Sequence, residues 1–319
     1  NLGADPYRPG GRFPATGVGA VDEGRDRERG GVEVARLLID IYTRTDTRSK
    51  VLGAAIARGI KTAGDSPVIS PTPIYNRPIG DVALFYAFKG RCKEIMADYL
   101  KAGKHVIYID RGYFGHRPPG TDHYNGYHRF AINGLHPTPD DVMREGHKVD
   151  RWKHHRIDPQ KHYKGSHILL AGMSPNQARK AGLKANEWEI RTAKELRRVT
   201  KRTILCKPKP SWDDAPSVPG CVDAREKTLG QCLWGCHLTV SHHSNVAIDG
   251  LIAGVPGMVT DGPCQNICPE GGLIEKPFFP SKTFLAQFLS GLSYWQWNRD
   301  EMANGSAWEF LRERLLSTH

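Results

Sequence analysis

Apolar and polar positions follow two periods along the chain, the period of strands and the period of helices. Four short runs in the first half predict strands: residues 35–42, which have the composition of a buried strand, and residues 67–70, 79–85 and 105–109. Two stretches between them, residues 51–61 and 91–100, have helical spacing. Alternating strands and helices predict a parallel sheet with right-handed crossovers, so ligand-binding groups should follow the strands.

The same alternation returns in the second half. It predicts three strands and two helices there: strands at residues 167–171, 203–206 and 237–240, and helices at 185–198 and 229–234. In the first of these helices, Trp188, Ala193 and Leu196 are spaced to face a core, and the basic residues are spaced to face outward. The second half is therefore predicted to form a second α/β domain.

Composition shifts along the chain indicate its domain organisation. Residues 1–31 are rich in Gly and Pro and lack an apolar period, which predicts a loop-like or disordered segment. We expect a first α/β domain at 32–147, a basic linker at 148–165 and a second domain at 166–319, with terminal helices returning toward the first domain. Residues 112–139 are rich in Gly, Pro, His and Tyr, and we interpret them as a functional loop, with a packed surface loop as the alternative.

Residues 237–256, HLTVSHHSNVAIDGLIAGVP, predict a strand, a polar turn and a short helix. Ser244 or Asn245 is a natural N-cap, and Gly254 with Pro256 should stop the helix. Such a turn exposes backbone N–H groups and the positive end of a helix dipole, which suits a phosphate. Asp249, about one turn further, could accept hydrogen bonds from ribose hydroxyls. The alternative is an ordinary strand-to-helix turn without a ligand.

Three segments carry a resemblance to a known family. Residues 241–256, SHHSNVAIDGLIAGVP, resemble the donor-site turn of GT-B glycosyltransferases, S-x-S-N-x-A-x-[DE]-x-L-x-x-G-x-P. Residues 292–308, LSYWQWNRDEMANGSAW, are similar to the C-terminal LAxxQWTxxEMxxGxAW of a phage-encoded branch of that superfamily. Residues 109–114, IDRGYF, lie near YHR at 127–129 and NGLHP at 133–137 and form the third match. The resemblance implies two Rossmann-like domains facing across a cleft, and transfer of a sugar from a nucleotide-diphosphate donor, in the first instance a UDP-sugar, to a hydroxyl.

The resemblance also implies the donor-site residues. A glycine-containing turn beside the donor phosphates would include Gly172 and Ser174, and KPKPS at 207–211 resembles the RPKPS of the family. The full implied set, with the turn described above, is Gly172, Ser174, Lys207, Lys209, His242, His243, Ser244, Asn245 and Asp249. The two lysines would supply charge to a diphosphate, Lys207 as a point donor where the family commonly has Arg.

An inverting enzyme of this class needs a general base on the acceptor side. Asp110 follows a predicted strand and is the first candidate, with a capping role as the alternative. Asp46 and His128 are the next candidates. We expect no essential metal, because no DxD motif stands at a strand end. The Cys-x3-Cys spacings at 232–236 and 264–268 favour packing over a zinc site.

Charge bears on the acceptor. The 319 residues carry 45 Lys+Arg against 34 Asp+Glu, a formal charge of +11, which suits a polyanionic partner. The first hypothesis is therefore a hydroxymethylated base in double-stranded phage DNA, flipped out of the duplex. Its expected contacts are Arg111, Arg117, Arg129, Arg151, Lys153 and Arg156.

Two alternatives stay open at this point: a saccharide or lipid-linked acceptor, or a non-catalytic protein that binds nucleotides or nucleic acid. No apolar run approaches 18 residues, so we expect no membrane span. The seven cysteines are odd in number and unevenly placed, and we expect free thiols and a cytoplasmic location, the host cytoplasm if the gene is phage-encoded.

Overall fold

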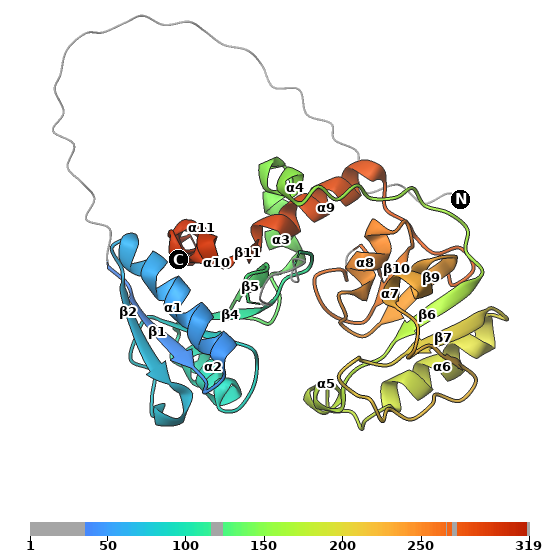
Figure 1. Cartoon of the computed structure of the whole chain (residues 1–319), viewed down its shortest axis with the longest axis horizontal. Helices are drawn as coiled ribbons and strands as arrows, with labels where there is room; N and C mark the ends of the chain where they lie inside the picture. Colours follow the sequence, from blue (N-terminus) through green and yellow to red (C-terminus); the bar gives the residue numbers. More distant parts are fainter. Residues whose placement is uncertain (1–35, 116–123, 266, 270–272, 318–319) are drawn as a thin grey trace, which may run out of the picture. The chain divides into compact units, whose positions relative to one another are not determined.

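The computed structural model describes residues 36–115, 124–265, 267–269 and 273–317 (Figure 1). The segment 1–31 and Arg117, both named above, lie outside these residues. From Arg36 onward the chain forms one compact unit. The expected domain borders at 147 and 165 therefore stay predictions.

The first sheet has six strands in the order β11-β5-β4-β3-β1-β2. Its members are β1 (Leu38–Thr43), β2 (Ser66–Pro71), β3 (Val82–Tyr86), β4 (His105–Arg111), β5 (His128–Ile132) and β11 (Gln296–Trp297). β1 to β4 pair in parallel, whereas β5 is antiparallel to β4 and β11 is antiparallel to β5. The four strands and two helices predicted for this half are confirmed, the helices being α1 (Thr47–Thr62) and α2 (Cys92–Lys101).

β5 was not predicted, because it lies inside the stretch interpreted as a loop. Its sequence, HRFAI, begins with two polar residues and has no alternation long enough to indicate a strand. Phe130 and Ala131 are nevertheless fully buried. The long-range pairing of β5 with β4 and β11 thus decides its conformation.

The second sheet has five strands in the order β10-β9-β6-β7-β8, and all of them are parallel. Its members are β6 (His167–Ala171), β7 (Thr203–Lys207), β8 (Val222–Asp223), β9 (Cys236–Ser241) and β10 (Gly257–Val259). The helices of this half are α5 (Pro175–Lys180), α6 (Glu187–Val199), α7 (Leu229–Leu233) and α8 (Val246–Ile252). The parallel strands β1 to β4 of the first sheet and the parallel second sheet, each with helical crossovers, confirm the predicted α/β class with two Rossmann-like halves.

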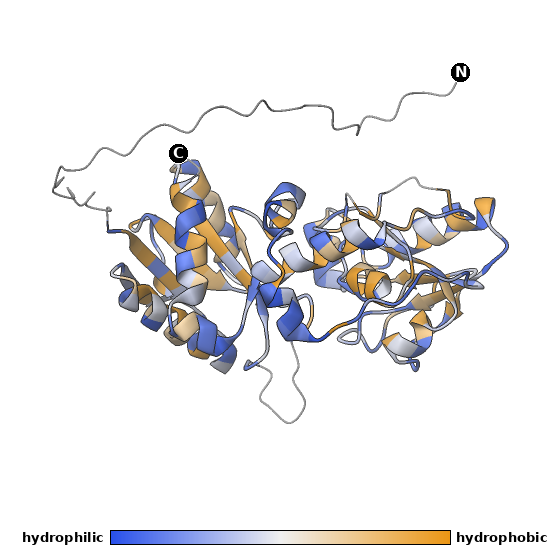
Figure 2. Cartoon of the chain, turned by 90° about the horizontal axis from the view of Figure 1, so that it is seen from above, coloured by the Kyte–Doolittle hydropathy of each residue, from blue (hydrophilic) through white to orange (hydrophobic). Residues whose placement is uncertain are grey.

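The sequence pattern explains how these helices pack. In α6, Trp188, Ala193 and Leu196 are buried as predicted, at the spacing of one helix face. In α1, Leu52, Ile56 and Ile60 recur every four residues and are all fully buried. Figure 2 shows the same division, with apolar colour concentrated on the strands and polar colour on the outer faces of helices.

The C-terminal elements join the first half of the fold, and β11 is a strand of its sheet. α9 (Lys282–Tyr294), β11, α10 (Arg299–Ala303) and α11 (Ser306–Leu316) follow one another, and α10 packs against α1 (Figure 1). The contact is close, because a Cβ added at Gly59 of α1 would lie 2.1 Å from the Met302 carbonyl oxygen. Asp65 anchors α11 by accepting from Trp308 Nε1 at 2.8 Å and from Arg312 Nε at 2.7 Å.

Two short helices, α3 (Pro139–Glu145) and α4 (Asp150–His155), lie between the two sheets in sequence, and α4 falls within the segment expected to be a linker. Among the helices of the described ranges, none combines the length and the apolar character needed to cross a membrane.

Candidate functional site

The carboxyl end of β4 carries Asp110, the first candidate for a general base. Its Oδ2 accepts hydrogen bonds from the Tyr108 hydroxyl at 2.6 Å and from Arg129 Nη2 at 3.3 Å. Its Oδ1 accepts from the backbone N–H of Arg111 at 2.8 Å. Asp110 and Arg129 are partners in the antiparallel register of β4 and β5. The strand that the sequence did not indicate therefore supplies the counter-ion of Asp110.

The protonation of Asp110 follows from these contacts. Burial raises its pKa, but the charge of Arg129 and the hydrogen bonds from Tyr108 and the Arg111 N–H together bring the pKa below its usual value. The carboxyl group is thus ionised at neutral pH. Because its side chain is still 29% exposed, it can meet a ligand.

Arg129 is an interior residue. Its side chain is 12% exposed, and its guanidinium lies over the rings of Tyr108 and Tyr113, 6.0 and 5.7 Å from their centroids. Its buried Nε has no hydrogen-bond partner within the described ranges. We therefore place Arg129 in the site beside Asp110 and no longer assign it to a nucleic-acid surface.

Lys209 brings a second cation from the other sheet, two residues after β7. Its pKa is lowered by burial and by the positive charges of Arg129 and Arg111, while the negative charge of Asp110 acts in the opposite direction. The ammonium has no hydrogen-bond acceptor and no ion-pair partner in the part of the chain that the structure describes. A half-buried ammonium in this state favours a bound anion.

Two histidines lie beside these charges. His136 Nδ1 is 3.3 Å from the Tyr113 hydroxyl, and His243 Nδ1 is 2.9 Å from His242 Nδ1. Burial and neighbouring positive charge lower the pKa of His136 well below its usual value; burial and His242 lower that of His243 to about 4. Both rings are thus neutral at pH 7. His136 stands in the NGLHP segment, which carried part of the resemblance, but the sequence pattern does not indicate a role for it.

The predicted strand, turn and helix at 237–256 are confirmed as β9, a polar turn and α8. Three consecutive backbone N–H groups of the turn, at His243, Ser244 and Asn245, have no acceptor among the described residues. The N–H of Val246 is already bonded, since it donates to Ser244 Oγ at 3.3 Å. The turn itself, more than the helix end, therefore offers the open donors that suit an anion.

Asn245 occupies the N-cap position of α8, but its side chain makes no capping bond. Its Nδ2 donates instead to the carbonyl oxygen of Gly112 at 3.2 Å. Gly112 follows β4, and a Cβ there would lie 2.7 Å from the Tyr127 carbonyl oxygen, so the position requires glycine. This hydrogen bond ties the turn after β9 to the strand end that carries Asp110.

Asp249 lies in α8, one turn beyond that segment. Burial raises its pKa to about 6. No described residue forms a hydrogen bond or an ion pair with its carboxyl group. Its expected contact with ribose hydroxyls stays a prediction. The carboxyl group is available for that contact, because no described residue occupies it.

The two lysines of the KPKPS segment differ. Lys207 points its ammonium at backbone carbonyl oxygens, which hold it: those of Ala224 and Arg225, each at 3.3 Å, and that of Lys227. Of the two, only Lys209 lies among the charges of the site. Gly172 donates its N–H to the Lys207 carbonyl oxygen at 2.9 Å, and the Ser174 hydroxyl caps α5.

The other two candidates for a base are engaged elsewhere. Asp46 caps α1 by accepting from the Ser49 N–H at 3.0 Å, and it pairs with Arg44 at 2.5 Å. His128 is 1% exposed and packs edge-on against Tyr86 at 5.9 Å between ring centroids. We therefore carry neither residue into a catalytic role.

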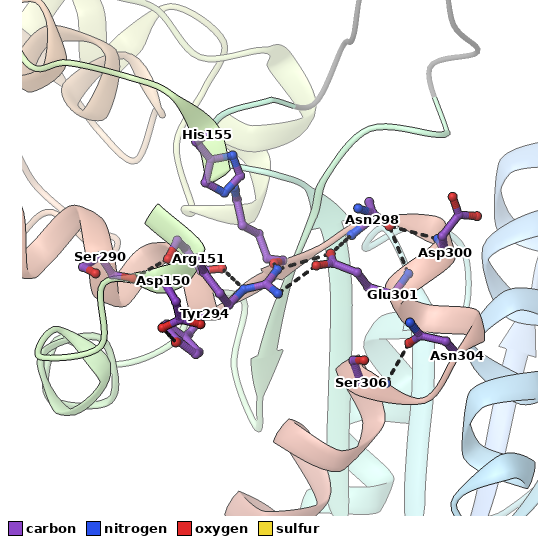
Figure 3. A network of polar contacts seen from close by, with 12 residues as sticks. Asp150, Arg151, His155, Ser290, Tyr294, Asn298, Asp300, Glu301, Asn304 and Ser306 are labelled. Atoms are coloured by element: carbon purple, nitrogen blue, oxygen red, sulfur yellow. Dashed lines mark hydrogen bonds and ion pairs between the residues drawn. The ribbon is translucent and has the colours of Figure 1, made fainter. Parts of the chain in front are cut away.

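Arg151, expected to contact nucleic acid, is the centre of an internal network (Figure 3). Its guanidinium donates to both oxygens of Glu301, at 2.8 and 3.2 Å, and lies 3.7 Å from the centroid of the Trp297 ring. It also donates to the carbonyl oxygens of Ser293 and Gln296, both at 2.9 Å. These contacts hold α4 against the C-terminal segment, so we withdraw Arg151 from the expected nucleic-acid surface.

Gln296 is a positioning residue that the sequence did not single out within the LSYWQWNRDEM segment. Its side chain is fully buried. Its Oε1 accepts from the N–H groups of Tyr113 at 2.8 Å and Phe114 at 3.3 Å, and its Nε2 donates to the Phe114 carbonyl oxygen at 3.3 Å. The glutamine thus fixes the chain that leaves β4 directly after Asp110.

The remaining expected nucleic-acid contacts are on the surface. Arg111, Lys153 and Arg156 are exposed. Arg117 lies outside the described residues. Of the six expected contacts, the described part of the chain thus leaves three available to a polymer.

The cysteines are all free, and six of the seven are buried. In the described ranges, no group of three or more His, Cys, Asp and Glu side chains is placed to hold a metal ion. The expectation of metal-independent chemistry stays a prediction.

Comparisons with known proteins give remote structural likenesses. No family model and no curated protein matches the sequence. The structure is similar to KpsC of Thermosulfurimonas dismutans, beta Kdo 2,4 transferase, with a TM-score of 0.48 and 13% identity over 82% of this chain and 92% of that chain. It is also similar to KpsC, beta Kdo 2,7 transferase, of the same organism (TM-score 0.44, 13% identity, 86% and 99% covered). A third similar structure is the glycotransferase of kitacinnamycin (TM-score 0.32, 12% identity, 89% and 100% covered). The fold assignment rests on the topology of the two sheets.

Proposed function

We propose that this protein is a glycosyltransferase that moves a sugar from a nucleotide-diphosphate donor to a hydroxyl group. One observation carries the proposal: an ionised carboxylate, Asp110, lies at the end of β4 among cations that come from both sheets. Lys209 follows β7, and the open N–H groups at 243–245 follow β9. In α/β folds, ligands bind at these carboxyl ends of parallel strands.

The cationic groups suit the leaving group. When the bond from the sugar to the diphosphate breaks, negative charge grows on the departing oxygen, and preorganised donors stabilise that charge. Lys209 has an unpartnered ammonium, Arg129 has an unpartnered Nε, and the turn has three open N–H groups, in each case among the described residues. His243 is neutral at pH 7 and can hydrogen-bond a phosphate oxygen without another full charge.

Asp110 suits the acceptor side. The attacking hydroxyl becomes acidic as its bond to the sugar carbon forms, and a carboxylate within hydrogen-bond reach can then accept the proton. Arg129 and Tyr108 orient the carboxylate through Oδ2, and Oδ1, which accepts only from the Arg111 N–H, keeps a further lone pair. A bound substrate would displace water from the Asp110 carboxylate. The loss of water raises the pKa of Asp110 and makes it a stronger base.

For the acceptor, we propose a hydroxymethylated base in double-stranded DNA. The formal charge of +11 and the exposed Arg111, Lys153 and Arg156 support this choice. A saccharide hydroxyl is the second candidate. The interior positions of Arg129 and Arg151 favour it, because they remove two of the contacts expected for DNA.

The test is a two-way panel. The purified chain is incubated with nucleotide sugars of different base and sugar, and with either hydroxymethyl-base DNA or oligosaccharides, and the products are analysed by mass spectrometry. Addition of one hexose-sized mass to the digested nucleoside supports the DNA acceptor, and addition to an oligosaccharide supports the second candidate. An Asp110→Asn variant should lose transfer while still binding nucleotide.

Failure of every donor to be hydrolysed or transferred, in a folded protein that still binds nucleotide, would leave a non-catalytic binding protein and overturn the proposal.

A further inference from the structure

A pocket opens at the carboxyl ends of β6, β7 and β8, next to the charges described above. Its apolar lining includes Met173, Pro208, Trp212 and Val218. Pro208 directly precedes Lys209 in the chain, so the pocket and the proposed phosphate-binding lysine are neighbours. If the protein binds a nucleotide-diphosphate donor, as proposed above, this pocket is placed to take its base.

Glu189 of α6 is the polar group that stands out in this pocket. Its side chain is 2% exposed. Its Oε1 accepts from the Met173 N–H at 2.6 Å, and its Oε2 is buried without a hydrogen-bond partner among the described residues. A buried acceptor without a donor is costly, and a ligand that donates a hydrogen bond would remove the cost.

The Arg225 guanidinium and the Asn186 amide, which line the pocket, already donate hydrogen bonds within the chain. Arg225 donates to Asp223 at 2.9 and 2.7 Å and to the carbonyl oxygens of Asp213 and Ala215 at 3.0 and 2.8 Å. The amide of Asn186 donates to the Pro216 carbonyl oxygen at 3.3 Å. Among the described residues, the open groups that remain in the lining are the buried acceptor Glu189 Oε2 and two donors nearer the surface, the Trp212 Nε1–H and the Ser217 hydroxyl.

This chemistry distinguishes nucleobases. Guanine, adenine and cytosine carry an exocyclic amino group with two donor hydrogens, whereas uracil has no amino group and its single N3–H donor is flanked by two carbonyl acceptors. A carbonyl oxygen placed against Glu189 would face an oxygen of like partial charge. We propose that Glu189 selects the donor nucleotide, and that the pocket takes an amino-bearing base in preference to the uracil expected from the sequence.

Binding of GDP, ADP, CDP and UDP, measured by isothermal titration calorimetry, tests the proposal. At least one amino-bearing nucleotide should bind about tenfold or more tightly than UDP, the effect of one hydrogen bond to a charged group. In Glu189→Gln, the amide oxygen can still accept from the Met173 N–H, but an NH2 donor replaces Oε2. The preference should then move toward UDP by about tenfold or more.

Glu195→Gln is the matched control, because Glu195 lies on the same helix and is exposed. It should leave all four affinities unchanged. Should Glu189→Gln fail to fold, Trp212→Leu replaces it, and this variant should weaken all four nucleotides without changing their order.

The outcomes separate the two proposals. Equal affinities, UDP as the tightest ligand, or an unchanged order in folded Glu189→Gln would overturn the role of Glu189 and leave the proposed function standing. If none of the four nucleotides binds, the nucleotide-sugar donor itself is wrong.

Discussion

The charged groups that hold α4 and the C-terminal helices to the first sheet are paired with one another, whereas Glu189 and Lys209, at the carboxyl ends of the second sheet, keep open hydrogen-bonding capacity among the described residues. In the first region, Asp65 accepts from Trp308 and Arg312, and Arg151 binds Glu301. In the second, Glu189 Oε2 and the Lys209 ammonium have no partner within the described ranges.

The difference indicates what each set of charges does. A buried polar group is stable when its partners are fixed, and such a network defines one packing. A polar group left without a partner near a surface lowers stability unless a ligand completes it. The sequence shows only that Arg151 and Lys209 are both basic. The hydrogen bonds in the fold show that Arg151 has a structural role and that Lys209 is open to a ligand.

The largest expected effect comes from breaking the paired region. Arg151→Met should lower the free energy of unfolding by about 3 kcal/mol, because it removes the ion-pair partner of Glu301 and a donor to two carbonyl oxygens. Nucleotide affinity of the folded fraction should not change. Urea denaturation measures the first quantity and calorimetry the second.

Lys153→Met on the same helix is the control, and the exposed side chain should make its effect on stability small. A decrease in stability that is the same for both variants would contradict the structural role of Arg151.

The next test compares the two lysines of the KPKPS segment. Lys209→Met should lower the kcat of donor hydrolysis or transfer about a hundredfold, since it removes a donor to the growing diphosphate charge. Its stability should be unchanged or slightly higher, because a desolvated charge is removed. Lys207→Met should instead lower the free energy of unfolding by about 1 kcal/mol, because three carbonyl oxygens lose a donor. Equal decreases of kcat in the two variants would contradict the different roles of the two lysines.

Asp249, an unpartnered group of the second region, should make both stability and nucleotide affinity depend on pH. Its pKa is about 6 in the folded chain against an ordinary value of 3.8, so the folded state binds the extra proton between these values. This group therefore contributes a decrease in stability as the pH rises from about 4 to 6, and a constant amount above that range. Hydrogen bonds from ribose need the ionised form, so nucleotide affinity should fall as the pH drops through 6.

Asp249→Asn should remove that pH dependence. At pH 7.5 it should weaken nucleotide binding by about 1.5–3 kcal/mol, the range for a hydrogen bond to a charged group. A wild-type affinity that is flat between pH 5 and 7 would exclude Asp249 from the ribose site.

The smallest expected effect concerns exposed charges. Replacing Lys153 and Arg156 by Glu should reduce the slope of log affinity for duplex DNA against log salt by about two, near 0.9 for each phosphate that is no longer neutralised. The matched control replaces Lys194 and Arg198, exposed on α6, by Glu. Identical slopes in parent and both variants would remove these residues from the DNA surface and favour the saccharide acceptor.

Much of the architecture could be predicted because it depends on local pattern. The strands β1 to β4, β6, β7 and β9 are short runs of strand character, and α8 is followed by its own stop at Gly254 and Pro256. Asp110 could be placed at a strand end for the same reason. β5 could not be predicted, because its five residues have no decisive period and owe their conformation to β4 and β11.

The sequence by itself determined the two α/β halves, the strand-end position of Asp110 and the position of the turn at 241–245, because periodicity and turn chemistry act over neighbouring residues. Only the tertiary structure decided which basic residues are available. Arg129 and Arg151 look like any exposed arginine in the sequence, yet one pairs with Asp110 and the other with Glu301, whereas Lys209 keeps its charge unpaired among the described residues. The physical reason is that an ion pair or a desolvated charge depends on groups far apart in the chain, and only folding brings them together.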